Sequence, residues 1–273
     1  MEWILLILIG FLAGTIGSLV GLGGGIIIVP ALLFLSAGTG LLSGINPHIA
    51  VGTSLIVIIF TGLSSTLTYM KKKIVDYKSG LIFFIGSGPG SILGAWVNKI
   101  FNLASFSLWF GIFMIFVSIV LILKDKIKPL DQSGKKGFTR TFTDVKGMVY
   151  TYSFQPVLGI LIAFLAGFFG GLFGIGGGSL MVPVMIIFFL FPPHVAVATS
   201  MLIIFLSSIT SSITHVFFGN VNWLYALVLI PGAWYGGKAG ALLNMRLESK
   251  TIVNLLRIVL IIVGIRLIYQ GVS

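Results

Sequence analysis

Two glycine clusters are the residues of this chain that most clearly suggest a chemical role. Gly23-Gly24-Gly25 and Gly176-Gly177-Gly178 each end a Gly-x-Gly-Gly-Gly run inside a long apolar stretch. Successive glycine N–H groups next to the start of a helix favour an anion. The alternative is that these glycines only let helices pack closely, but the occurrence of two matching runs favours binding. We therefore predict that six glycines bind substrate: Gly23, Gly24, Gly25, Gly176, Gly177 and Gly178.

Two copies of a Pro-His-x-Ala-Val-x-Thr-Ser motif add hydroxyl donors. Each copy places a histidine at the start of an expected helix and a Thr-Ser pair one to two turns deeper. The hydroxyls can donate to an anion or bond back to a carbonyl of their own helix, and the histidine can simply cap the helix. Later hydroxyls, including Ser207 and Ser208, are assigned to helix packing. The candidate substrate ligands of the motif are His48, Thr53, Ser54, His194, Thr199 and Ser200.

Charged groups limit the chemistry further. Lys238 falls inside an expected membrane segment, where ionisable residues are costly and often functional, although it lies near enough to the helix end to snorkel. We count Lys238 among the candidate substrate ligands. All six acidic residues fall in expected loops or at the terminus, so we expect no buried carboxylate and no cation site. The chain has no cysteine, so no thiol nucleophile and no thiolate metal site. We separately expect no catalytic residues, no metal and no cofactor.

The composition is that of a membrane protein. Of the 273 residues, 57% are hydrophobic and only 8% are charged, about a third of the charged share of soluble domains. This excludes a soluble enzyme, a disordered chain and a nucleic-acid binder. The net charge of +11 fits basic cytoplasmic loops. We expect a multi-pass protein of the cell (inner) membrane, with the lipid bilayer as a partner and no nucleic acid.

An internal repeat organises the chain. Phe11–Pro30 and Phe164–Pro183 are identical at 12 of 20 positions, and His48–Asn98 aligns without a gap onto His194–Asn244 with 15 identities in 51. The sequence therefore predicts three parts. Residues 1–123 form the first membrane repeat, residues 124–152 a basic cytoplasmic linker with a turn at Ser133-Gly134, and residues 153–273 the second membrane repeat.

The loop charges predict that the two repeats are inverted. Lys71, Lys72, Lys73 and Lys78 follow the second segment of the first repeat, whereas the matching loop of the second repeat is uncharged. By the positive-inside rule these loops lie on opposite sides; a parallel arrangement ranks second. The fold class is an all-α polytopic membrane protein with two inverted-topology repeats and eight to ten transmembrane segments. A glycine-broken first segment in each repeat either spans twice or is re-entrant.

These motifs resemble the sulfite exporter TauE/SafE family, also called the toluene sulfonate uptake permease family. The resemblance rests on Ala-Gly-x-x-Gly-x-x-x-Gly-x-Gly-Gly-Gly-x-x-x-Val-Pro at Ala13–Pro30 and Ala166–Pro183, together with the histidine motif and a Gly-x-x-x-Gly-x-x-x-Gly-Ala run in both repeats. It implies an inner-membrane permease for sulfite or organosulfonates.

The residues and the resemblance together indicate a secondary transporter, not an enzyme. Inverted repeats with glycine-broken helices are typical of carriers with a site at the midplane, and the polar groups available suit a small anionic substrate. We expect alternating access for sulfite or an organosulfonate; the alternatives are an anion channel or a permease for another small organic anion. The exact substrate, import versus export, proton coupling through His48 or His194, and assembly into a homo-oligomer stay open.

Overall fold

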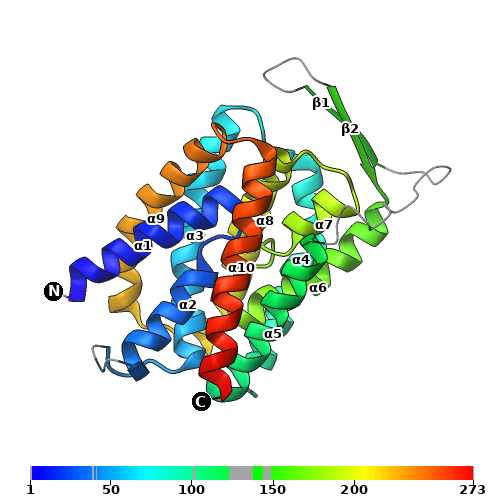
Figure 1. The fold of residues 1–273 in the computed structure, drawn as a ribbon. Coiled ribbons are helices and arrows are strands. Elements are labelled where there is room, and N and C mark those ends of the chain that lie inside the picture. The colour runs from blue at the N-terminus through cyan, green and yellow to red at the C-terminus, as the bar shows by residue number, and fades with distance from the viewer. Residues whose placement is uncertain are drawn as a thin grey trace.

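The computed structural model describes residues 2–38, 40, 42–100, 103–122, 138–143 and 149–272. Helices make up most of the molecule, and a two-stranded sheet stands at one end of the bundle (Figure 1). The elements are α1 Glu2–Val20, α2 Gly25–Leu33, a π-helical turn Phe34–Gly38, α3 Pro47–Lys71, α4 Tyr77–Asn98, α5 Leu103–Ile122, β1 Phe138–Thr143, β2 Val149–Phe154, α6 Pro156–Phe173, α7 Met181–Ile187, α8 Pro193–Phe217, α9 Trp223–Asn244 and α10 Ser249–Val272.

Helix length and hydropathy make the chain a multi-pass membrane protein. Within the described residues, six helices are long and apolar enough to cross a membrane, namely α1, α3, α4, α6, α8 and α9. Helices α5 and α10 have 20 and 24 residues. Helices α2 and α7 have only 9 and 7 residues, which at ~1.5 Å per residue is less than half of a ~30 Å hydrocarbon core. Each glycine-broken segment thus pairs one helix of spanning length with a short one.

Helices of one repeat pack on helices of the other. Helix α1 lies along α9, α6 lies along α4, and α3 packs on α8 (Figure 1). Glycines permit this close approach. A Cβ atom on Gly86 would lie 2.0 Å from the carbonyl oxygen of Ile160, and one on Gly232 would lie 2.0 Å from that of Ile7. Both glycines and both carbonyls occupy equivalent positions of the repeats, so the Gly-x-x-x-Gly runs are helix-packing surfaces.

The bundle has two ends, which we call the hairpin end and the far end. The hairpin end carries the α3–α4 turn, the strands and the start of α8; there the rings of Tyr152 and Phe191 lie 4.0 Å apart between centroids. The far end carries the start of α3, the end of α4 and the α8–α9 turn; there Lys99 Nζ lies 3.3 Å from the centroid of the Phe218 ring. The C-terminus lies at the far end (Figure 1).

The helical chain also contains a two-stranded hairpin, in and just after the linker, that the sequence did not predict. β1 and β2 pair as an antiparallel hairpin, with Phe138 opposite Phe154 and Thr143 opposite Val149. Their sequences alternate aromatic and β-branched residues with polar ones, which favours strands. Phe154 anchors the hairpin by packing 4.6 Å, between centroids, from Phe83 of α4. The Ser133-Gly134 turn lies outside the described residues.

The expectation that no carboxylate is buried is also wrong. Asp76 is only 6% exposed, because the hairpin covers it. Its carboxylate accepts hydrogen bonds from the Ser79 hydroxyl, from Arg140 Nη2 at 3.1 Å and from the Tyr152 hydroxyl at 3.0 Å. Burial alone would raise the pKa of Asp76, but these hydrogen bonds outweigh burial and hold that pKa below its usual value.

Candidate functional site

Each glycine run interrupts its helix with left-handed backbone. In the first repeat, Gly21, Gly23 and Gly24 have φ angles of +80°, +74° and +93°, a conformation that glycine adopts without steric cost. In the second repeat, Gly174 and Gly176 have φ angles of +71° and +79°. The glycines therefore stop α1 and α6 and redirect the chain, as the sequence predicts.

The two interruptions meet inside the bundle. A Cβ atom on Gly25 would lie 2.2 Å from the carbonyl oxygen of Gly174, so the backbones of the two repeats touch. Ile204 of α8 packs against both runs, because its Cγ2 atom would lie 2.9 Å from a Cβ on Gly23 and 3.0 Å from one on Gly176. The structure thus brings the six predicted glycines into one region.

Backbone donors are available at this meeting point. Helix α2 begins at Gly25 without a side-chain cap. Within the described part of the chain, no acceptor bonds the N–H groups of Gly24, Gly25 or Ile26. In the second repeat the N–H of Gly177 donates to Ser207 Oγ at 3.0 Å. The first break therefore offers three unpartnered donors to a ligand. Among the equivalent described donors of the second break, those of Gly177 and Ser179 are bonded and that of Gly178 is not.

The two serines of the histidine motifs bond across the repeats. Ser54 Oγ donates to the carbonyl oxygen of Gly174 at 2.7 Å, and Ser200 Oγ donates to that of Gly21 at 3.0 Å. Each hydroxyl satisfies a carbonyl where the opposite helix is interrupted. Ser54 and Ser200 therefore lie at the breaks, but in this structure their hydroxyls are used by the protein.

The two threonines make an equivalent pair of contacts at the two ends. Thr53 Oγ1 accepts from the N–H of Asn222 at 3.0 Å, and Thr199 Oγ1 accepts from the N–H of Asp76 at 3.1 Å. Asn222 and Asp76 are the N-cap residues of α9 and α4. Both threonines are fully buried. Each accepts a hydrogen bond from the N-cap residue of a helix in the opposite repeat.

The two histidines lie at opposite ends of the bundle, at the starts of α3 and α8. His48 Nδ1 is 2.9 Å from Asn98 Oδ1, and His194 Nδ1 is 3.1 Å from Asn244 Oδ1. Each asparagine also donates to a carbonyl of the opposite repeat, Leu172 or Leu19. The structure therefore supplies a packing role for both histidines, and their contact with substrate stays a prediction.

Lys238 does not join the glycine breaks. Its side chain is exposed on α9, and its neighbour Gly237 faces the carbonyl oxygen of Thr61 on α3. This exposed position favours the snorkelling alternative, and a role for Lys238 in substrate binding stays a prediction.

Ser207 and Ser208 of α8, which the sequence assigned to helix packing, lie next to the glycine breaks. Ser207 accepts from Gly177, and Ser208 Oγ would lie 3.0 Å from a Cβ atom on Gly176. Both are fully buried. Ser207 and Ser208 follow Ser200 by about two helical turns, so they lie on the same side of α8 as Ser200 and face the glycine run. This spacing could have indicated their position from the sequence alone.

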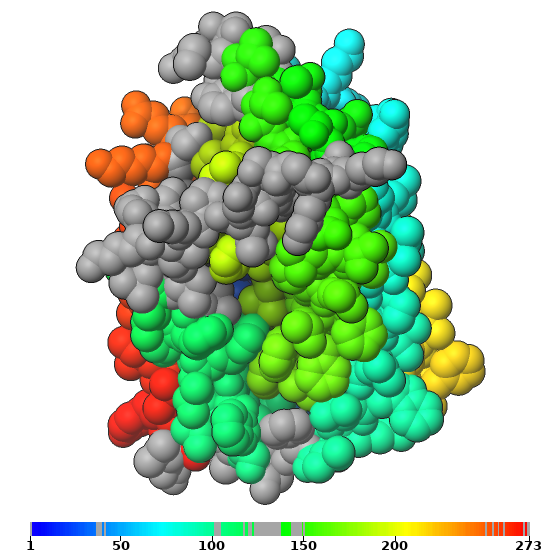
Figure 2. Space-filling model, turned by 90° about the vertical axis from the view of Figure 1, so that its right-hand side faces the viewer, coloured from blue at the N-terminus to red at the C-terminus, as the bar shows by residue number. Residues whose placement is uncertain are grey.

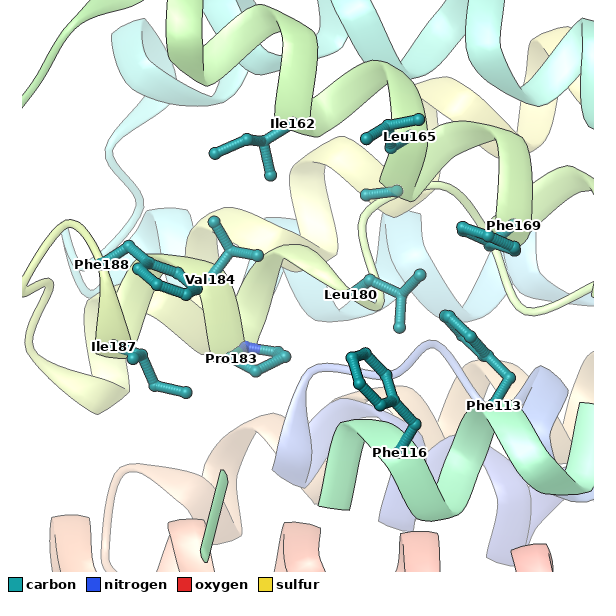
Figure 3. Close-up of a pocket in the computed structure, with 11 residues that line it drawn as sticks. Phe113, Phe116, Ile162, Leu165, Phe169, Leu180, Pro183, Val184, Ile187 and Phe188 are labelled. Atoms are coloured by element: carbon teal, nitrogen blue, oxygen red, sulfur yellow. The ribbon is translucent and has the colours of Figure 1, made fainter. Parts of the chain in front are cut away.

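A separate pocket of about 240 Å³ opens between α5, α6 and α7. Figure 3 shows its wall of aromatic and aliphatic side chains, including Phe113, Leu165 and Pro183, and Figure 2 shows a hollow on this side of the molecule, between α5 and α6. The lining has no hydrogen-bonding side chain. This pocket therefore cannot hold an oxyanion, and the glycine breaks remain the candidate site.

Comparison with known proteins identifies the family of the chain. The sulfite exporter TauE/SafE family matches residues 6–267. The chain belongs to this family. Among similar TauE/SafE proteins is the probable membrane transporter protein YunE of Bacillus subtilis, which is 63% identical over 272 residues, covering 100% of this chain and 99% of YunE. The probable membrane transporter protein MJ0441 of Methanocaldococcus jannaschii is 29% identical over 271 residues, covering 96% and 93%.

The TauE/SafE membership confirms the family predicted from the motifs. The names of its relatives support membrane transport as the general function. A probable membrane transporter protein of Xylella fastidiosa (strain Temecula1) is 28% identical over 266 residues, covering 97% of this chain and 92% of that protein. No solved structure matches the chain.

Proposed function

We propose that this protein is a secondary transporter that carries a small sulfur oxyanion or an organosulfonate, such as sulfite, across the cytoplasmic membrane. The observation that carries the proposal is the meeting of the two glycine breaks, where N–H groups of Gly24, Gly25 and Ile26 have no acceptor in the described part of the chain. Unpartnered backbone donors at membrane depth are tolerated where they line a cavity or bind a ligand. The ligand would therefore sit between the repeats.

The surroundings of the breaks favour an anion over a cation. The start of α2 carries a partial positive charge from the helix dipole. The acidic residues that the structure describes, Glu2, Asp76 and Glu248, lie at helix ends and away from the breaks. A sulfite or sulfonate group offers several oxygens that accept hydrogen bonds from N–H and O–H donors. Ser54 and Ser200 would join these donors if they exchanged their carbonyl partners for the ligand.

Inverted repeats give the breaks a role in alternating access. The crosswise contacts of Ser54 with Gly174 and of Ser200 with Gly21 are the same contact made in both directions, which supports a two-fold relation between the repeats. The basic loop after α3 supports a cytoplasmic hairpin end. In this arrangement the two breaks face each other across the centre, and rocking of one repeat against the other would expose the site to each side in turn.

An anion channel and a permease for another small organic anion are the alternatives, and a channel would share the same donors. Counterflow separates the channel from the carrier. In proteoliposomes, unlabelled sulfite inside should accelerate the entry of labelled sulfite if the protein is a carrier, whereas a channel shows neither acceleration nor saturation. Sulfoacetate, taurine, thiosulfate and sulfate, each tested as a competitor, define the substrate.

Hydrogen exchange tests the site directly. Sulfite should slow amide exchange at residues 22–28 and 174–181 of the purified protein, because a bound anion ties up donors at the breaks. Protection confined to other segments would overturn this site. Gly177→Ala provides the matching variant, because Gly177 has no positive φ and its added Cβ would meet Ser207 Oγ at 2.9 Å and Gly167 Cα at 3.0 Å, distances that a shift of a few tenths of an ångström relieves. We expect it to fold and to bind sulfite at least ten-fold more weakly.

Gly88→Ala is the control for that variant. Gly88 lies inside α4, and the nearest atoms to a Cβ added there belong to the ring of Phe84, at 3.0 Å. Sulfite affinity should be unchanged in this protein. Equal loss in both variants would mean that the substitutions act through general packing.

A further inference from the structure

Three polar side chains of α8 lie on one helix face. Ser208, Ser212 and His215 follow the spacing i, i+4 and i+7, which places them along one side of a helix. Their exposed fractions are 0%, 3% and 0%. The Ser208 and Ser212 hydroxyls have no partner among the described residues, and neither ring nitrogen of His215 makes a hydrogen bond of good geometry there, although the ring lies close to the backbone of Gly171. We call these three residues the α8 stripe.

The α8 stripe connects the glycine breaks with the far end. Ser208 Oγ would lie 3.0 Å from a Cβ atom on Gly176. Seven residues later, or ~10 Å along the helix, the carbonyl of His215 accepts from the N–H of Asn220 at 2.9 Å in the α8–α9 turn. His215 also lies close enough to His48 for an electrostatic interaction. The stripe therefore begins at the proposed site and ends beside the far end.

The stripe is costly unless it has a function. A buried polar group without a partner destabilises the folded state, and small apolar residues would avoid that cost. The repeat itself does not require these residues, because the equivalent positions of α3 hold Gly62, Thr66 and Tyr69. There the Tyr69 hydroxyl donates to the Ser18 carbonyl oxygen at 2.9 Å. The Thr66 hydroxyl, at the position equivalent to Ser212, is also buried without a partner among the described residues, so the repeats differ at the positions of Ser208 and His215.

We propose that Ser208, Ser212 and His215 line the route of the anion between the glycine breaks and the far end. The inference rests on the proposed function and adds residues to it. Two hydroxyls and an imidazole can each donate to an oxyanion oxygen. Burial closes the route in the present conformation, so the outer half of α8 must separate from its neighbours when the site opens to the far end. Lys99, which lies over Phe218 at the far end, adds positive charge near the opening.

Flux measurements on single variants test the route. In proteoliposomes loaded with unlabelled sulfite, we expect Ser212→Ala and His215→Leu each to lower the exchange of labelled sulfite at least ten-fold. His215→Gln keeps a donor and should recover part of that loss. Ser212→Ala removes no hydrogen bond, because the Ser212 hydroxyl has no partner among the described residues, and His215→Leu removes only the weak contact of the ring with the Gly171 backbone. The variants should therefore purify and unfold at or above the wild-type temperature.

Ser107→Ala is the matched control. Ser107 is also fully buried and unpartnered, but it lies on α5, which packs on α10, and it should not alter flux. Unchanged flux in Ser212→Ala and His215→Leu would overturn the route, and so would an equal loss in Ser107→Ala.

The same measurements separate this inference from the proposed function. If wild-type protein exchanges sulfite and Gly177→Ala does not, while the α8 variants behave as wild type, the route fails and the site stands. If wild-type protein carries none of sulfite, sulfoacetate, thiosulfate or taurine, the proposed function fails and the route with it.

Discussion

Asp76 of the α3–α4 turn accepts a hydrogen bond from Arg140 of strand β1, with 3.1 Å between the Oδ1 and Nη2 atoms. The carboxylate also caps α4 by accepting from the N–H of Ser79, and its own N–H donates to Thr199 of α8. One residue therefore joins the hairpin, α4 and the buried hydroxyl that the sequence marks as a candidate ligand. Its equivalent in the second repeat, Asn222, caps α9 and bonds Thr53 but is uncharged.

Removing Arg140 should loosen the hairpin without unfolding the bundle. The Arg140 side chain is 30% exposed, but that of Asp76 is only 4% exposed, so the loss of this charge-assisted hydrogen bond should cost about 1.5–3 kcal/mol. Asp76→Ala should cost more, because it also removes the α4 cap, which contributes ~0.5–2 kcal/mol. Limited proteolysis within β1 and β2 measures how far the loss of Arg140 loosens the hairpin. The unfolding temperature measures how far Asp76→Ala destabilises the protein. Lys72→Ala, at an exposed position of the same turn, should change neither.

Acid should release the hairpin. Because the folded pKa of Asp76 lies below its usual value, the ionised carboxylate stabilises the folded state at neutral pH. That stabilisation begins to decrease when the pH drops below the usual pKa of an aspartate, and it is lost as the pH drops through the lowered pKa of Asp76 in the folded protein. Proteolytic cleavage of the hairpin should therefore rise as pH falls from 5 towards 3. Asp76→Asn should be cleaved readily at every pH; a profile identical to wild type would contradict this account.

The sequence predicts the membrane helices and the glycine interruptions because both depend on local features. Apolar runs of spanning length and a five-residue cluster with glycine at four positions need no tertiary information. Both features were predictable without the structure. The cap of α3 was predicted wrongly: the side chain of Asn46 caps this helix by accepting from the N–H of Ile49, whereas the sequence suggested His48.

The burial of Asp76 and the hydrogen bonds of the serines were not predictable, because they depend on distant residues. Arg140 lies 64 residues from Asp76, and Gly174 lies 120 residues from Ser54. The charge of the linker concealed the hairpin, although Phe-Thr-Arg-Thr-Phe-Thr alternates as a strand does. Likewise, only the packed structure shows that Ser208 is unpartnered while Ser207 is bonded.

Gly86→Ala should disrupt packing between the repeats more than Gly88→Ala on the same helix. The added Cβ at Gly86 would lie 2.0 Å from the backbone oxygen of Ile160, whereas at Gly88 it would meet only a ring. Overpacking against backbone costs ~1–3 kcal/mol or more. Gly232→Ala should behave as Gly86→Ala does, because its Cβ would meet Ile7 equally closely. The unfolding temperature in detergent checks the series, and equal temperatures for Gly86→Ala and Gly88→Ala would contradict it.

Membrane topology is the prediction on which the facing arrangement of the glycine breaks depends. The chain has no cysteine, so single cysteines can be placed at Lys72 and Glu248 of the hairpin end and at Lys99 and Asn220 of the far end. In intact cells an impermeant thiol reagent should label the far-end positions, and the hairpin-end positions should react only after the membrane is opened.

Lys72 lies in the turn after α3, and Asn220 lies in the equivalent turn after α8. Inverted repeats require these two turns to face opposite sides, because each repeat then contributes an odd number of crossings. Labelling of both from one side would make the repeats parallel, and the two glycine breaks could not then be related by a two-fold axis in the membrane plane.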